Sequence, residues 1–169
     1  TWSYVGTGST TYTASSTLPT NAGTYTATAS VTANGNYAAA SSSATAFTIA
    51  AKALTITGLT GSNKVYDGNT TATATGTATL SGVISGDTPN VTLGGTVAYT
   101  FADSAIGTAK AITASGFSIS GTASANYSIT QPTGLTANIT AATPTIVVTV
   151  GSYTYSGSAQ GPNAVTGNT

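Results

Sequence analysis

The sequence has 169 residues and a formal net charge of zero; only 4% of its residues are charged, and His, Cys and Met are absent. Three lysines cannot neutralise enough phosphates for nucleic-acid binding. No apolar run approaches the roughly 18 residues of a membrane-spanning helix. Without His and Cys, the usual general base and the thiolate nucleophile are missing, so an enzyme is not expected.

Alternating apolar and polar residues indicate half-buried β-strands, because side chains on a strand point to opposite faces in turn. In chain order, the alternating segments are 24–33, 71–80, 91–101, 109–120 and 143–150. In the first of them, Tyr25, Ala27, Ala29 and Val31 share one face. Trp2 lies in a further apparent strand and is expected in a core. Good helix formers are scarce, so we predict an all-β chain.

Turn residues separate these strands. Clusters of Gly, Asn, Asp and Pro at 34–36, 67–69, 86–90 and 94–95 predict turns. Short strands at regular spacing with such turns suggest antiparallel β-sandwich modules. Because much of the apolar content is alanine, each module is expected to have its own thin core.

An ordered set of landmarks occurs twice. Gly23-Thr24, Asn36-Tyr37 and Ile49 recur as Gly107-Thr108, Asn126-Tyr127 and Ile139, and the last two landmarks are each displaced by 90 residues. This repetition predicts the end of one module in 1–50, a complete module in 51–140 and the start of another in 141–169. The two incomplete pieces together have the size of one sandwich, so we interpret the chain as one period of a tandem array.

Two families share these landmarks. Residues 51–140 resemble the YDG domain in Lys64-Val65-Tyr66-Asp67-Gly68-Asn69-Thr70 and Ala125-Asn126-Tyr127. The flanks resemble the MBG-type repeat, with 153–160 matching its start and 19–25 with 35–37 matching its end. Such repeats occur in large bacterial surface proteins, including haemagglutinin-like adhesins. The resemblance implies tandem immunoglobulin-like antiparallel β-sandwich modules, secreted to the bacterial cell surface as a stalk. It transfers no catalytic residue.

The aspartates are the candidate metal ligands. Asp67, Asp87 and Asp103, with backbone carbonyls, are the side chains that a Ca²⁺ site would use. Their wide separation in the sequence argues against such a site. In the Tyr-Asp-Gly turn, we expect Asp67 to accept hydrogen bonds from the backbone while the following Gly68 takes a positive φ. No other cofactor is expected.

Lysine and asparagine offer two covalent alternatives. An intramolecular isopeptide bond would join Lys52, Lys64 or Lys110 to Asn126 or Asn138, although solvated lysines are the favoured interpretation. Asn-x-Ser/Thr triplets mark the candidate glycosylation sites Asn69, Asn90, Asn126 and Asn138. Attached sugars would keep so uncharged a chain soluble.

The tyrosines present another alternative, a stacking platform for sugars. Tyrosine also suits strand positions where the ring is buried and the hydroxyl reaches solvent, so positions in the core or at its rim are favoured. The residues are Tyr4, Tyr12, Tyr25, Tyr37, Tyr66, Tyr99, Tyr127, Tyr153 and Tyr155.

These inferences favour a mechanical function. We expect a non-enzymatic repeat of a secreted bacterial fibre or adhesin stalk, whose partners are copies of itself or neighbouring repeats paired through edge strands. The alternative is a module that binds glycans or another surface polymer. Ice binding, suggested by the alternating threonines of 71–75, is the least favoured, because a flat threonine lattice normally needs a short repeat.

Overall fold

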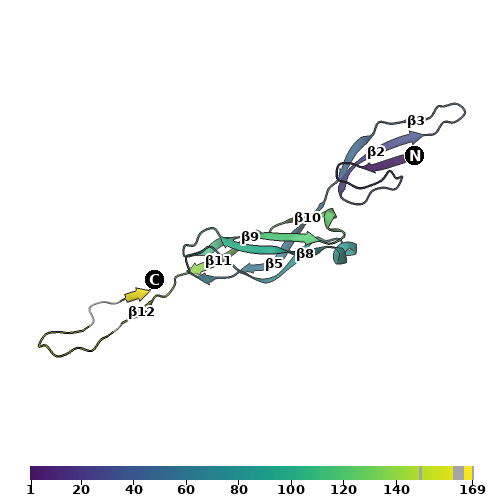
Figure 1. Cartoon of the computed structure of the whole chain (residues 1–169). Helices are drawn as coiled ribbons and strands as arrows, with labels where there is room; N and C mark the ends of the chain where they lie inside the picture. Colours follow the sequence, from purple (N-terminus) through teal and green to yellow (C-terminus); the bar gives the residue numbers. More distant parts are fainter. Residues whose placement is uncertain (149, 162–165, 169) are drawn as a thin grey trace.

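The computed structural model describes residues 1–148, 150–161 and 166–168. Its strands form three groups that follow one another along an elongated chain (Figure 1). The N-terminal sheet contains β1 (Trp2–Gly6), β2 (Gly23–Val31), β3 (Ala40–Ser41) and β4 (Thr45–Ile49). The C-terminal hairpin pairs β12 (Thr145–Val147) with β13 (Thr166–Asn168).

The central unit lies between these two groups (Figure 1). Its strands are β5 (Lys52–Gly61), β6 (Lys64–Val65), β7 (Ala74–Ser81), β8 (Thr92–Phe101), β9 (Gly107–Ser120), β10 (Tyr127–Thr130) and β11 (Leu135–Thr140). Two short 3₁₀ helices, η1 (Ser85–Asn90) and η2 (Ser124–Asn126), interrupt them. The described chain is therefore nearly all β, as predicted.

The predicted strands correspond to β2, β7, β8, β9 and β12, with shifted ends. β7 begins at Ala74 instead of Thr71. Thr71 is held in the preceding turn, because its carbonyl accepts a hydrogen bond from Lys64 and its N–H donates to the side chain of Asn69. Thr149, inside the last predicted strand, lies outside the described residues.

Two sheets enclose the core of the central unit. One has the order β10-β5-β7 and the other β6-β11-β9-β8. Ile56 of the first sheet is buried in one cluster with Phe101, Ile112 and Ile139 of the second. A smaller cluster joins Leu54, Val91 and Tyr127 near η1 and η2.

Both sheets are mixed, which corrects the expectation of purely antiparallel pairing. β10 runs parallel to β5, and β6 runs parallel to β11. Between β5 and β6, and again between β9 and β10, the chain crosses from one sheet to the other. A strand that enters from the opposite sheet is not joined to its neighbour by a hairpin, so no tight turn forces an antiparallel direction.

The predicted turn at Gly94-Gly95 is wrong. Both residues lie inside β8 and pair with Ser118 and Phe117 of β9, next to a shift in register. At this bulge φ is +110° for Gly95 and +83° for Gly116, and a Cβ on Gly116 would lie 1.9 Å from the carbonyl oxygen of Thr96. Glycine therefore permits a bulge between two long strands instead of ending one of them.

The N-terminal sheet is a single layer with one apolar face. Residues that pair directly across strands share a face, and Tyr25 of β2 pairs with Phe47 of β4 while Ala27 pairs with Tyr4 of β1. The predicted face through Tyr25, Ala27, Ala29 and Val31 is thus part of a wider apolar surface. The rings of Tyr25 and Phe47 stack with centroids 5.4 Å apart.

Trp2 lies on this apolar face but is not in a core, which corrects the prediction. It pairs with Ala29, and its side chain is 57% exposed. Among the described residues, no strand covers this face of the sheet. Tyr25, 1% exposed, is the buried exception, because Tyr12 and Phe47 both pack against it.

Candidate functional site

The Tyr-Asp-Gly turn is organised by a lysine. Lys64 of β6 forms an ion pair of 2.6 Å with Asp67 and donates to the carbonyl oxygens of Asn69 and Thr71 at 2.9 and 3.1 Å. Asp67 also accepts a hydrogen bond of 3.1 Å from the N–H of Asn69, and Gly68 between them has a φ of +79°. Asp67 thus caps the turn as predicted, and Lys64 fastens β6 to that turn and to Thr71, which follows it.

Asp103 and Lys110 form a second pair. Their side chains are 2.5 Å apart, and Asp103 also accepts from the N–H of Ala105 at 2.8 Å. The lysine side chains of the two pairs, Lys64 and Lys110, are only 17% and 14% exposed. The interpretation of these two lysines as solvated is therefore wrong, because each one lies along the protein surface and holds a turn.

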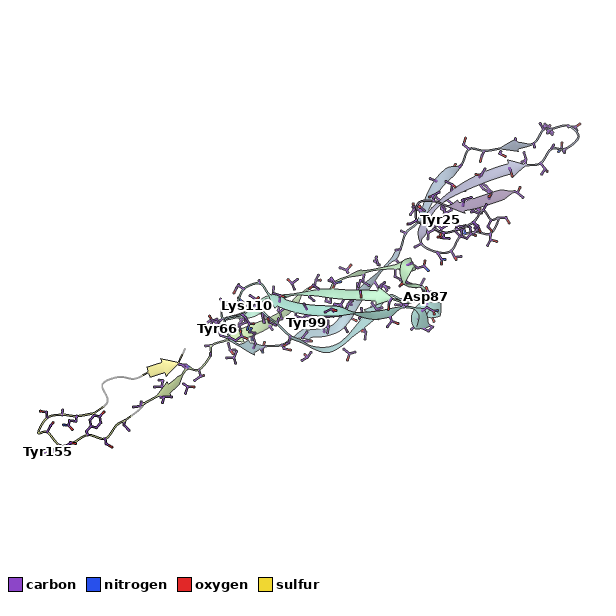
Figure 2. The ribbon with its side chains drawn as sticks, in the orientation of Figure 1. Tyr25, Tyr66, Asp87, Tyr99, Lys110 and Tyr155 are labelled. Atoms are coloured by element: carbon purple, nitrogen blue, oxygen red, sulfur yellow. The ribbon has the colours of Figure 1, made fainter. Side chains whose placement is uncertain are left out.

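The third aspartate has a different partner. Asp87 in η1 accepts a hydrogen bond of 2.7 Å from the hydroxyl of Tyr127, which itself accepts one from the N–H of Ile84. Burial of the ring, and then the bond to Asp87, raises the pKa of Tyr127. The phenol joins η1 to the start of β10. Figure 2 shows Asp87 and Lys110 at separate places on the central unit.

The structure does not bring the three aspartates together. Each holds a turn of its own, and the described residues contain no cluster of three potential metal ligands from His, Cys, Asp and Glu. The candidate Ca²⁺ ligands are thus accounted for by Lys64, Lys110 and Tyr127.

Acid is expected to weaken the central unit below about pH 4. The lysine hydrogen bonds lower the pKa of Asp67 and of Asp103 from the ordinary 3.8. This contribution to stability is complete above the unfolded-state pKa, and it is lost as the pH falls through the lower folded-state values. The carboxylates are 49% and 62% exposed, so the effect is small.

Thermal unfolding monitored by circular dichroism measures this loss as a lower Tm in acid. The control is the double variant Asp67→Asn, Asp103→Asn, which should start from a lower Tm at neutral pH and fall less on acidification. An acid dependence equal in the variant and in the natural sequence would contradict the assignment.

Asn126 connects the central unit to the N-terminal sheet. Its side-chain oxygen accepts a hydrogen bond of 2.8 Å from the N–H of Ala22, and its amide nitrogen donates to Asn21 at 3.2 Å. The carbonyl of Asn21 in turn accepts the hydroxyl of Tyr25. The junction therefore has a second connection beside the covalent link between β4 and β5. Sequence reasoning missed this role, although the repeated Asn-Tyr pair marked the residue.

Removing this second connection is expected to loosen the junction. In Asn126→Ala, both bonds are lost, and the N-terminal sheet should reorient more freely relative to the central unit. Residual dipolar couplings of the two parts measure this directly. Asn90→Ala is the matched control, since Asn90 has no side-chain hydrogen bond within the described part of the chain. Couplings that fit one common alignment equally well in both variants would refute the role.

The remaining candidate asparagines have structural contacts of their own. Asn69 accepts from Lys64, and the side chain of Asn138 accepts from the N–H of Ala109 at 2.8 Å. Asn138 also donates its N–H to Asn63 at 2.7 Å. Of the candidate isopeptide partners, Lys110 and Asn138 lie on the neighbouring strands β9 and β11, but the Nζ of Lys110 contacts Asp103. Glycosylation stays a prediction, and Asn90 has the side chain least engaged by the protein.

The tyrosines do not form one platform. Tyr25 and Tyr127 are buried, while Tyr37, Tyr66 and Tyr155 are exposed in different parts of the chain. Figure 2 shows Tyr66 on the central unit and Tyr155 near the far end of the C-terminal segment. Only Tyr4, Tyr12 and Tyr25 gather, in a chain of ring contacts with Trp2 and Phe47 in the N-terminal part. The nine tyrosines therefore do not share one surface.

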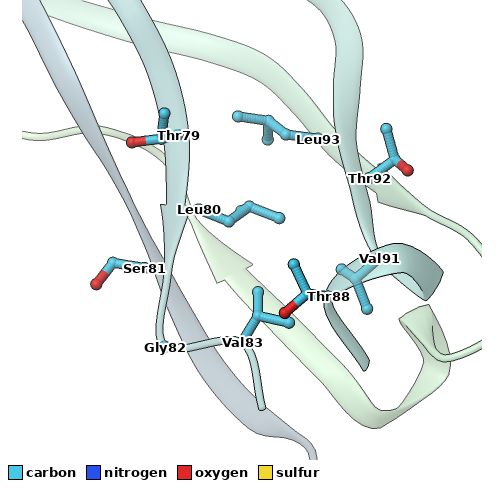
Figure 3. Close-up of a pocket in the computed structure, with 9 residues that line it drawn as sticks. All are labelled: Thr79, Leu80, Ser81, Gly82, Val83, Thr88, Val91, Thr92 and Leu93. Atoms are coloured by element: carbon cyan, nitrogen blue, oxygen red, sulfur yellow. The ribbon is translucent and has the colours of Figure 1, made fainter. Parts of the chain in front are cut away.

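A groove lies between the end of β7, η1 and the start of β8 (Figure 3). Its volume is about 560 Å³, with Leu80, Val83 and Leu93 among its apolar lining and Thr88 and Thr92 as hydroxyl groups. None of the nine residues that line it is aromatic or charged. The groove thus lacks the stacking rings and the charged groups that sugar-binding or catalytic sites use.

The strand pairing repeats along the chain. Gly23 of β2 pairs with Ile49 of β4, just as Gly107 of β9 pairs with Ile139 of β11. β1 pairs antiparallel with β2, as β8 does with β9. The N-terminal sheet therefore reproduces one sheet of the central unit.

The hairpin of β12 and β13 reproduces part of the other sheet. Thr145, Ile146 and Val147 pair with Asn168, Gly167 and Thr166. In the central unit, Thr55, Ile56 and Thr57 pair in the same order with Ser81, Leu80 and Thr79 of β7. β12 and β13 pair through these three residue pairs, whereas β5 and β7 pair through six, with a register shift between Thr57 and Leu59.

Two β-sheets around a shared core, with a turn held by Lys64 and the Asn126-Tyr127 pair at the start of β10, define an all-β class of unit. Residues 50–135 match the YDG domain family. Because this match covers about half of the chain, the chain belongs to the YDG domain family. Searches of curated proteins and of solved structures found no match. No helix among the described residues is long and apolar enough to span a membrane.

Proposed function

We propose that this chain is a non-enzymatic structural repeat of a secreted bacterial fibre or adhesin stalk. In this proposal it consists of tandem immunoglobulin-like sandwich modules, with MBG-type pieces in 1–50 and 141–169 around the YDG module of 51–140. The observation that carries the proposal is the repeated strand register along the long axis of the chain. Units of this kind joined in series give a rod whose length grows with the number of repeats.

The contacts at the junction between the N-terminal sheet and the central unit support the proposal of a rod. Asn126 joins the central unit to the loop at Asn21 and Ala22, which limits swinging about the covalent link. All six charged side chains belong to 51–140, and four of them form the two ion pairs that fasten turns. Most of the charged side chains of the chain thus stabilise turns of the fold.

Electron microscopy of the native extracellular material, with mass spectrometry of the same sample, tests the proposal. Long filaments or stalks that contain this sequence, with an axial period of one or two sandwich lengths, would support it. Mass above that of the polypeptide would reveal attached sugars. Finding the protein only in the cytoplasm, or only as compact single particles, would refute the proposal.

The glycan-binding alternative receives less support. The groove of Figure 3 has no aromatic lining, and the exposed tyrosines are dispersed. Ice binding is weaker still, because Ala72 is buried and Thr71 bridges to Thr100, so 71–75 does not form a free flat lattice.

A further inference from the structure

The apolar face of the N-terminal sheet is open. Trp2 and Val31 on this face are 57% and 62% exposed, and Tyr4, Phe47 and Ile49 are only partly buried. The corresponding face of the central unit is closed: Ile112, Phe101 and Ile139 there are at most 4% exposed. The difference is the opposite sheet, since Ile56 of β5 and Leu80 of β7 cover that face.

The chain itself contains the strands that would close the open face. The β12–β13 hairpin has the register of β5 and β7. By the offset of 90 residues that relates Ile49 to Ile139, Ile146 takes the place of Ile56, which is 8% exposed in the central core. Yet Ile146 itself is 64% exposed, and Val148 is 52% exposed.

The hairpin cannot close the sheet of its own chain. The two lie at opposite ends of the central unit, which separates them along the long axis (Figure 1). The apolar face of the N-terminal sheet of one chain can instead contact the β12–β13 hairpin of another chain. Neither 1–50 nor 141–169 contains a charged residue, so no charge has to be desolvated when they pack together.

We propose that residues 143–148 and 166–168 of one copy bind across the apolar face of the N-terminal sheet of a second copy, and so complete a two-sheet unit. This inference rests on the proposed function and specifies how its repeats join. Residues 142–145 of the first copy lie parallel to residues 37–40 of the second, as β5 lies parallel to β10. Where repeats follow one another in one polypeptide, the same pairing joins consecutive repeats.

This pairing also accounts for Tyr37. The corresponding Tyr127 is 6% exposed and bonded to Asp87, whereas Tyr37 is 74% exposed. β3, which follows Tyr37, pairs with β2 through only two residue pairs, Ser30 with Ser41 and Val31 with Ala40. If β3 leaves β2 and pairs with a strand of another copy, only these two residue pairs are lost. The new pairing buries the ring of Tyr37.

A second contact follows from the junction at Asn126. That residue contacts Asn21 and Ala22, which immediately precede Gly23, the landmark that recurs as Gly107. The residues before Gly107 are Ala105 and Ile106, and Ile106 is 60% exposed beside an apolar pocket that also includes Tyr66. In the proposed dimer, Asn36 of the second copy contacts this site.

Trp2, the only tryptophan, reports the association directly. As the concentration of the purified chain rises, we expect its fluorescence emission to shift to the blue, together with a rise in mass by analytical ultracentrifugation. Ile146→Asp should weaken the association by at least about 100-fold, since it places a charge in the completed core. The matched control is Thr145→Asp, because the corresponding Thr55 is exposed, and this variant should associate within about 10-fold of the natural chain.

Disulfide trapping tests the register, because the chain has no cysteine of its own. A chain with Ala40→Cys and a chain with Thr145→Cys should form a mixed disulfide when combined, since these positions are paired on the outer face. Ala39→Cys is the control: its side chain points to the opposite face, so it should trap poorly. Tyr37 should become resistant to nitration in the trapped dimer.

A chain that stays monomeric at millimolar concentration, or equal trapping by Ala39→Cys and Ala40→Cys, would overturn the inference. Association unaffected by Ile146→Asp would overturn it too. None of these results bears on the electron microscopy of native material. Filaments there together with a monomeric chain here would leave the structural function standing and reject only this mode of joining.

Discussion

Replacing Gly116 with alanine is expected to destabilise the central unit by about 3–5 kcal/mol. Gly116 has a φ of +83°, which an L-residue adopts only with strain, and a Cβ there would lie 1.9 Å from the carbonyl oxygen of Thr96. Because the obstacle is backbone, relief requires β8 and β9 to separate at the bulge, in the middle of the longest strand pair. Urea unfolding followed by circular dichroism measures the change.

Gly68→Ala is the matched control. Gly68 has a similar φ of +79°, but nothing lies within 4 Å of the position its Cβ would take. This variant has the backbone strain without the clash, so we expect a loss of about 1–2 kcal/mol. Equal losses in the two variants would show that the close approach of β8 and β9 is not needed for stability.

Leu54→Ala is expected to cost about 2–5 kcal/mol, the usual range for a cavity left by a buried leucine. Leu54 is 0% exposed and packs with Val91 and Tyr127, at the point where β5 runs parallel to β10. Loss of this contact weakens the corner that holds η1, η2 and the parallel strands together.

The control for this cavity is Leu18→Ala. Leu18 is 66% exposed, so its truncation should change the free energy of unfolding by less than about 0.5 kcal/mol. Urea unfolding of both variants checks the comparison. A small loss in Leu54→Ala would mean that the second cluster is not part of the cooperative core, and that the parallel pairing is held by the backbone alone.

The Gly116→Ala and Leu54→Ala variants also separate folding from assembly. Both changes lie in the central unit, away from the open face at Trp2 and from the hairpin at Ile146. If the proposed joining is correct, a moderately destabilised Leu54→Ala chain that is still folded should associate like the natural chain, whereas Ile146→Asp should unfold normally and not associate.

The sequence by itself determined the strands β2, β7, β8, β9 and β12, with shifted ends, and the YDG family. Alternation with period two is a local property, because each side chain's face follows from its position along the strand, and it placed Tyr25, Ala27 and Ala29 on one face correctly. The Asp67-Gly68 turn is equally local, since capping and positive φ involve residues next to each other. The spaced landmarks of the YDG domain can also be recognised from their order along the sequence.

Only the tertiary structure decided the roles that depend on distant partners. Asn21 and Asn126 meet across 105 positions, and no local pattern encodes that contact. Gly94-Gly95 is read as a turn until β9 is placed beside it, and Trp2 is read as core until its side chain is found to be 57% exposed. The physical reason is the same in each case: burial, bulges and parallel pairing depend on which strand arrives opposite, and that strand is remote in sequence.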